Sequence, residues 1–193
     1  MKTLKCVLVL LTFVGLSLVG CSEEPQLPVT SIDQSSLEKV TITNFTFTDA
    51  PIGFTGEGEI KLVGGNWIIK DYGVIENFSS PDPLVNGTMV HYLSLTIDAV
   101  TGEGPCNGSW TVTPTENTEG GVWEGTYQGY RSLSSVPEEW TLPLNVVGHG
   151  RGGTIDGLKM SATAILTIYT DGITTLPSYW TGVGDGFYKS HEN

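Results

Sequence analysis

The side chains best suited to hold a ligand lie on two neighbouring predicted strands in the second half of the chain. Trp123, Tyr127 and Arg131 recur at every fourth position, so they share one face of a β-strand. His149 and Arg151 share a face of the next strand in the same way. If these faces line a barrel, they form a cationic pocket with aromatic walls, which suits an apolar ligand that carries a carboxylate. The alternative places both arginines outside, neutralised by some of the 21 acidic residues.

His91 is a separate candidate, because it lies on an apolar strand face with Met89 and Leu93. This position predicts a histidine that is packed in the core or lines a cavity, with a general base as the alternative. An isomerase or cyclase would also need a carboxylate, such as Glu124, beside a histidine in the same cavity. The sequence therefore leaves enzymatic activity uncertain, leans against it, and identifies no catalytic residue.

Other kinds of chemistry lack their usual residues or spacing in this chain. The three histidines, His91, His149 and His191, do not stand at ligand spacing, and there is no Asp-x-Asp-x-Asp-Gly calcium loop. There is no Gly-x-Ser-x-Gly nucleophile elbow either. Cys106 lies in a loop-like Gly-Pro-Cys-Asn-Gly segment without a basic neighbour to lower its pKa, so we expect a packed thiol. We predict neither a metal site nor a cofactor.

Tryptophan offers a second kind of binding surface. If two or more of the five tryptophans were exposed together, they could stack on sugars. The competing interpretation is packing in the core or at a barrel rim, because three of them follow glycine turns on strands. The five are Trp67, Trp110, Trp123, Trp140 and Trp180.

The elements that must position these side chains are short β-strands. Residues 89–97 alternate most clearly between an apolar and a mixed face, and similar runs recur between glycine-rich turns. Val40 and Ile42 alternate in the opposite phase to Phe45 and Phe47, which predicts a bulge or a strand switch near residues 43–44. No window shows a capped helical stripe. With 25 glycines, which let coiled strands bend, the pattern predicts an all-β fold. We expect a closed or nearly closed antiparallel barrel of about eight strands, with a β-sandwich as the alternative.

Three short motifs built from glycine and aromatic residues carry a resemblance to a known family. They are Val-Trp-Glu-Gly-Thr-Tyr at 122–127, Val-Val-Gly-His-Gly at 146–150 and Gly-Thr-Ile-Asp-Gly-Leu-Lys at 153–159. This pattern resembles the allene oxide cyclase-like barrels, which include bacterial proteins of unknown function, over residues 85–190. The resemblance implies an eight-stranded barrel whose interior holds an apolar small molecule. No catalytic residue of the plant cyclases matches this chain, so the resemblance does not imply their activity.

The N-terminus predicts a bacterial lipoprotein. Two lysines precede an apolar run over residues 7–19, which is too short to cross a bilayer as a helix but fits a signal peptide. The Leu-Val-Gly-Cys segment that follows resembles a lipobox, in which Cys21 is acylated, for example with palmitate. Ser22 stands where an aspartate would favour retention in the inner membrane. We therefore expect attachment to the bacterial outer membrane or cell surface.

The chain thus divides into a signal peptide over residues 1–20, a lipidated tether over 21–38 and a single barrel domain over 39–193. Removal of the signal peptide takes two lysines and no acid, so the net charge moves from −12 to −14. So acidic a protein repels nucleic acid and anionic headgroups. We predict no nucleic-acid partner and a membrane partner through the lipid alone. Protein partners stay open.

These observations predict a surface or periplasm-facing lipoprotein that binds a small apolar or amphipathic ligand inside its barrel. The first alternative is a structural or glycan-contacting protein with a filled barrel, because side chains alone fill the interior of many eight-stranded barrels. The second alternative is an isomerase or cyclase-type enzyme.

Overall fold

The computed structural model describes residues 39–56, 58–116, 119–169 and 179–192. These residues form nine strands and one short 3-10 helix, and no helix among them is long and apolar enough to cross a membrane. The predicted signal peptide, Cys21 and the tether lie outside the described residues. The elements are β1 (Lys39–Gly56), β2 (Glu59–Val63), β3 (Asn66–Ser79), β4 (Gly87–Asp98), β5 (Gly104–Pro114), β6 (Val122–Leu133), β7 (Glu139–Arg151), η2 (Gly153–Ile155), β8 (Lys159–Tyr169) and β9 (Tyr179–Glu192).

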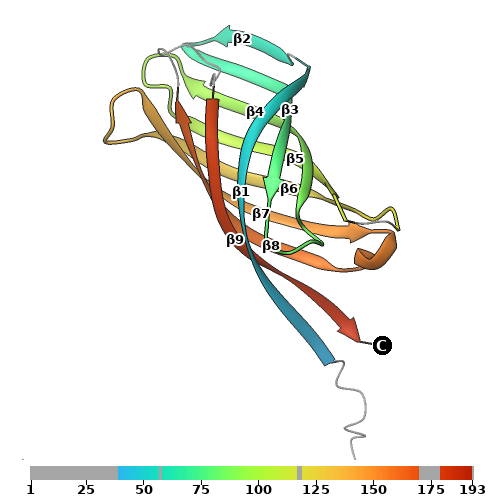
Figure 1. Ribbon diagram of the computed structural model, residues 1–193. Helices are drawn as coiled ribbons and strands as arrows, with labels where there is room; N and C mark the ends of the chain where they lie inside the picture. Colours follow the sequence, from blue (N-terminus) through green and yellow to red (C-terminus); the bar gives the residue numbers. More distant parts are fainter. Residues whose placement is uncertain (1–38, 57, 117–118, 170–178, 193) are drawn as a thin grey trace, which may run out of the picture. The chain divides into compact units, whose positions relative to one another are not determined.

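The strands form one antiparallel sheet that closes on itself (Figure 1). Neighbours follow the order β1-β9-β8-β7-β6-β5-β4-β3-β2, and a further pairing of β1 with β3 joins the ends. The first part of the long β1 pairs with β9 and its last part with β3. Among the described strands, β2 pairs with β3 alone. The fold is therefore a closed eight-stranded antiparallel barrel with one extra strand, as the sequence predicted, and not a β-sandwich.

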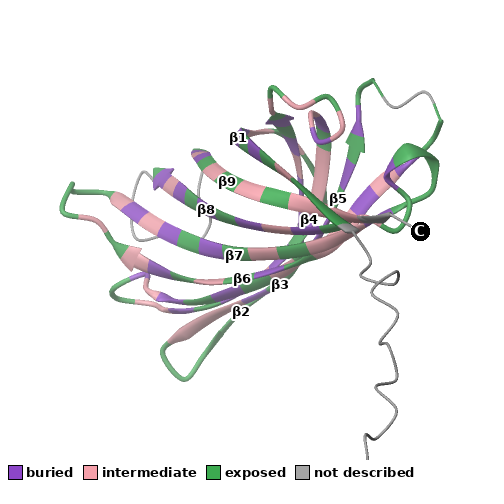
Figure 2. Cartoon of the chain, turned by 90° about the horizontal axis from the view of Figure 1, so that it is seen from below, coloured by how far each residue is buried: buried purple, intermediate pink, exposed green. Residues whose placement is uncertain are grey.

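Side chains alternate between the barrel interior and the outer surface, as the colours of Figure 2 show. On β8, for example, Met160, Leu166 and Ile168 are buried inside. The apolar face of residues 89–97 also turns inward, as part of β4. Only one face of each strand is removed from solvent when the barrel forms. Burial of the apolar side chains therefore determines which face points into the barrel.

Glycines on the inner face make room for aromatic rings. The Trp110 ring lies across Gly125 and Gly148, where added Cβ atoms would stand 2.8 and 2.5 Å from the ring. The Tyr127 phenol lies over Gly108, which leaves no space there for a side chain. The glycine-rich strands therefore serve packing inside the barrel as well as bending of the sheet.

The bulge or strand switch predicted near residues 43–44 of β1 is absent. β1 pairs with β9 without interruption from Lys39 to Asp49. Val40 and Ile42 are exposed, because β1 and β9 run on together beyond the barrel as a two-stranded ribbon (Figure 1). Both faces of such a ribbon are exposed to solvent. The alternation of its apolar residues therefore does not indicate which strand face is buried in the core.

Candidate functional site

The interior of the barrel contains a cavity of about 70 Å³. Apolar and aromatic side chains from all eight barrel strands form most of its wall. A space of this size holds a few water molecules or a very small organic molecule, since an engineered cavity that binds benzene measures about 150 Å³. The ionisable side chains in the wall are Asp49, Glu76, His91, Cys106, Tyr127 and Arg131. An apolar pocket with a few convergent polar groups is the usual form of a small-molecule site.

Three of these polar side chains form a chain across the interior from β6 through β4 to β3. The phenol oxygen of Tyr127 lies 2.8 Å from Nδ1 of His91, and Nε2 of His91 lies 3.5 Å from Oε1 of Glu76. The indole N–H of Trp180 on β9 donates to the same Glu76 oxygen. Strand register explains the meeting, because His91 faces Val74 and Glu76 is the next residue of β3 on that face.

Asp49 is a second buried carboxyl group in the cavity wall. Burial raises its pKa to about 8, with a further contribution from the negative charge of Glu76. Asp49 is therefore mostly protonated at neutral pH, which avoids two like charges in an apolar interior. Its carboxyl group packs against Gly182, where a side chain would collide with it.

Arg131 places a buried cation in the same wall. Its side chain is 2 % exposed, and its guanidinium carbon lies 4.7 Å from the centre of the Trp140 ring. Burial lowers the pKa of Arg131 to about 10, an effect that the nearby Cys106 partly offsets, so the group stays charged at neutral pH. No acidic side chain among the described residues forms an ion pair with it.

Buried polar atoms without hydrogen-bond partners are concentrated around this cavity. Within the described part of the chain they are Oδ1 of Asp49, Nε2 of His91, Nε1 of Trp110, and Nε and Nη1 of Arg131. All four residues line the cavity. Leaving one such atom unpaired costs about 1–3 kcal/mol, and more when the group is charged. Their convergence on one space indicates a polar occupant.

Four of the six residues predicted to bind a ligand face this cavity: His91, Trp123, Tyr127 and Arg131. Trp123 is fully buried, and its indole N–H donates to the carbonyl oxygen of Leu84 at 2.7 Å. The shared face predicted for the three residues of β6 is therefore the inner face.

His149 and Arg151 lie on the outer surface, which excludes them from an interior pocket. Nε2 of His149 lies 2.9 Å from Oε1 of Glu124, and Nε of Arg151 donates to the same oxygen at 2.6 Å. The hydrogen bond from Arg151, together with the smaller effect of His149, lowers the pKa of Glu124. The reason is strand alternation, because Trp123 points inward and its neighbour Glu124 therefore points outward, opposite His149.

The carboxyl groups inside the barrel were not among the predicted site residues. Glu124 was the acid expected beside a histidine, whereas Glu76 is the acid beside His91 in the interior. A signal was present in the pattern. Asp49 continues the apolar alternation of β1, and Glu76 occupies the buried phase of β3. A charged residue in the buried phase of a strand is an informative exception to the usual burial rule.

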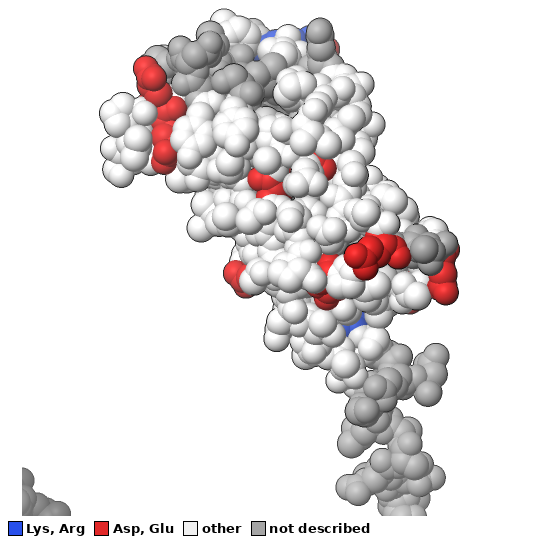
Figure 3. Space-filling model, in the orientation of Figure 1, with Lys and Arg blue, Asp and Glu red and all other residues white. Residues whose placement is uncertain are grey.

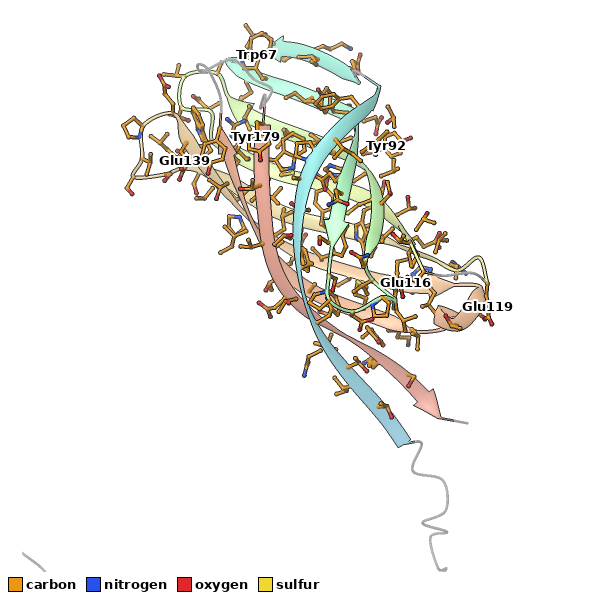
Figure 4. The ribbon with its side chains drawn as sticks, in the orientation of Figure 1. Trp67, Tyr92, Glu116, Glu119, Glu139 and Tyr179 are labelled. Atoms are coloured by element: carbon orange, nitrogen blue, oxygen red, sulfur yellow. The ribbon has the colours of Figure 1, made fainter. Side chains whose placement is uncertain are left out.

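The tryptophans do not form an exposed platform for sugars. Trp110, Trp123, Trp140 and Trp180 are buried, whereas Trp67 is partly buried near one end of the barrel (Figure 4). A glycan-contacting protein with a filled barrel was expected to have no cavity and two or more exposed tryptophans. The described residues show neither feature.

Cys106 is a packed thiol, as predicted, but it lies within strand β5 and not in a loop. Burial raises its pKa to about 12 despite the opposing effect of Arg131, so almost no thiolate is present at neutral pH. No group of three or more His, Cys, Asp and Glu side chains among the described residues could hold a metal ion.

The outer surface is acidic. Asp and Glu side chains are spread over the face shown in Figure 3, and Figure 4 places Glu139 toward one end of the barrel and Glu116 and Glu119 at the other. The positive charge of Arg131 is thus enclosed in a protein whose net charge is −12. An anionic ligand would meet repulsion at long range and attraction only inside the barrel.

Comparisons with protein-family models, curated proteins and solved structures found no match for this chain. The resemblance to the allene oxide cyclase-like barrels stays a prediction based on its three motifs. Function is therefore inferred from the chemistry of the site.

Proposed function

We propose that this protein is a lipoprotein whose barrel binds a small, mostly apolar molecule with one acidic group, held by Arg131. The observation that carries the proposal is the guanidinium of Arg131, which is buried and has two nitrogen atoms without partners. An unpaired buried charge destabilises a protein by several kcal/mol. A carboxylate would supply the acceptors that these donors lack, in charge-assisted hydrogen bonds.

The rest of the wall indicates the chemistry of the remaining part of the ligand. Aromatic and aliphatic side chains dominate, so most of the molecule is apolar. The unpaired indole N–H of Trp110 offers one further donor for an oxygen atom. A cavity of about 70 Å³ favours an acid with few non-hydrogen atoms, unless side chains move aside. The cavity and its unpaired atoms favour ligand binding over the filled-barrel alternative.

The binding site is tested by titrating the full-length protein in mild detergent with acetate, butyrate and benzoate, and with the matching neutral amides. Isothermal titration calorimetry should show saturable binding of at least one acid and weaker binding of its amide. Arg131→Met should lower the affinity for that acid at least about tenfold, since a hydrogen bond to a charged group contributes about 1.5–3 kcal/mol.

Arg151→Met is the matched control, because Arg151 is an exposed arginine on the outer surface. This variant should bind the acids as the wild type does. Unchanged affinity in the Arg131→Met protein, or equal affinity for acids and amides, would show that Arg131 does not hold the ligand. Failure of all three acids to bind would overturn the proposed ligand class.

Attachment to the outer membrane or cell surface through Cys21 is part of the proposal. Its support is the order of basic, apolar and Leu-Val-Gly-Cys segments at the N-terminus. Cells grown with an alkynyl palmitate analogue should label the protein. Cys21→Ala should abolish the label, and Cys106→Ala, which changes a thiol in the barrel core, should retain it. A label that persists in the Cys21→Ala protein would contradict lipidation at this residue.

A further inference from the structure

The chain from Tyr127 through His91 to Glu76 lines the same cavity as Arg131, yet holding an acid at Arg131 does not require it. The order of groups is hydroxyl, imidazole and carboxylate, with 2.8 Å between the phenol oxygen and Nδ1 and 3.5 Å between Nε2 and the carboxylate. The same order activates hydroxyl groups in enzymes, because the imidazole takes the hydroxyl proton and the carboxylate orients and stabilises the imidazole.

The neighbours of the chain favour one arrangement of its protons. The Glu76 carboxylate accepts the indole N–H of Trp180, and in its ionised form it attracts an N–H on the facing Nε2 of His91. Nδ1 of His91 is then the acceptor for the phenol O–H of Tyr127. Burial, with smaller effects of Cys106 and Glu76, raises the pKa of Tyr127, so the phenol keeps its proton at rest.

We propose that the barrel is also an enzyme that moves a proton on small oxo acids, with Tyr127 as the group that exchanges the proton with the substrate. The substrate carries a carboxylate, which Arg131 holds, and a ketone, beside which the reacting C–H bond lies. This proposal rests on the proposed function, because it needs the acid to be bound at Arg131.

The step balances without any further reactant. As the C–H bond breaks, its proton goes to the phenol oxygen of Tyr127 and the phenol proton passes to Nδ1 of His91. The electron pair of the C–H bond moves toward the ketone oxygen and leaves an enolate. The Glu76 carboxylate faces the resulting imidazolium. When the phenol and imidazolium protons exchange with solvent before the reverse transfer, a solvent-derived proton returns to carbon, so the net reaction is isotope exchange at the carbon beside the ketone.

Trp110 supplies the remaining feature that an enolate needs. Its indole N–H lines the same cavity and has no partner among the described residues. In a site that holds little water, a preorganised donor directed at the oxygen where negative charge develops lowers the activation barrier of the proton transfer. The Trp110 ring packs directly against Gly125 and Gly148, which have no side chains to displace it.

The test is deuterium uptake from D₂O into pyruvate and levulinate, followed by proton NMR with the full-length protein in mild detergent. The two probes place the ketone at different distances from the carboxylate. Wild-type protein should exchange at least one probe faster than the buffer blank. Tyr127→Phe should lower that rate at least about 100-fold, the usual contribution of a general acid or base, while calorimetric binding of the same probe persists.

Tyr92→Phe is the matched control, because Tyr92 is a tyrosine on β4 whose side chain lies on the outer surface (Figure 4). It should exchange at the wild-type rate. Exchange that survives in the Tyr127→Phe protein would overturn the role of Tyr127. Binding of both probes without exchange would overturn the enzyme and leave the proposed binding function standing. Failure of both probes to bind would overturn the enzyme, whereas the proposed binding function falls only if acetate, butyrate and benzoate also fail to bind.

Discussion

Replacing Arg131 with methionine should make the barrel more stable while it removes the binding of acids. Burial lowers the pKa of Arg131 to about 10, and the difference from an exposed guanidinium corresponds to a cost of about 3 kcal/mol. The folded protein holds this proton less tightly than the unfolded chain does. The cost therefore applies at every pH below about 10 and is relieved as the pH rises further.

The net gain is smaller than this cost. Methionine keeps an unbranched apolar chain against the Trp140 ring, but it loses the cation–π contact, which contributes about 0.5–2 kcal/mol. We expect Arg131→Met to raise the free energy of unfolding by about 1–2 kcal/mol. For a protein of this size, that gain corresponds to a Tm increase of roughly 2–8 °C.

The assay is differential scanning calorimetry at neutral pH on the full-length protein after dialysis against buffer without carboxylic acids. Arg151→Met should keep the wild-type Tm within a degree or two, because an exposed ion pair contributes little. A Tm below that of the wild type in the Arg131→Met protein would contradict this prediction. Such a result would mean that the guanidinium stabilises the fold through contacts inside the protein.

Three further results follow from the interior and the surface charge. Burial raises the pKa of Asp49 to about 8, so wild-type stability should fall as the pH rises from about 4 to about 8. In thermal melts the Tm advantage of Asp49→Asn should grow over this range and then level off; an advantage that stays constant from pH 4 to 8 would contradict the raised pKa. Gly148→Ala would place a Cβ atom 2.5 Å from the Trp110 ring and should cost about 1–3 kcal/mol by urea unfolding, whereas Gly56→Ala, with open space around it, should be neutral. Raising the ionic strength should speed the association of the acid that binds, followed by stopped-flow tryptophan fluorescence, since salt screens the acidic surface; a constant rate would exclude repulsion as a barrier.

The fold could be predicted from sequence because its main signals are local. The alternation of residues 89–97 and the recurrence of glycine beside aromatic residues are each sufficient to indicate coiled antiparallel strands. The inner face of β6 and β7 could not be chosen in the same way. Both faces of these strands carry aromatic or basic side chains, so the pattern alone did not separate Arg131, which is inside, from Arg151, which is outside.

The interior acids were missed for a related reason. A reading that looks for apolar residues on the buried face assigns Asp49 and Glu76 to the surface, because an isolated carboxyl group is rarely buried. Local rules tend to fail where a protein places groups for function, since such groups are stable only in a particular three-dimensional setting. The setting here is closure of the barrel, which brings β3, β4, β6 and β9 around one cavity.

The distribution of charge inside the barrel argues against a purely structural role for these groups. A charge cluster that served stability would pair Arg131 with an interior carboxylate, because an opposite charge offsets the cost of burial. Instead, burial and Cys106 dominate the pKa of Arg131, while Asp49 responds to burial and to Glu76. Among the described residues, no ion pair joins Arg131 to either acid in the wall of this cavity. That separation leaves Arg131 free for an anion from outside and leaves Glu76 free to act through the imidazole beside it.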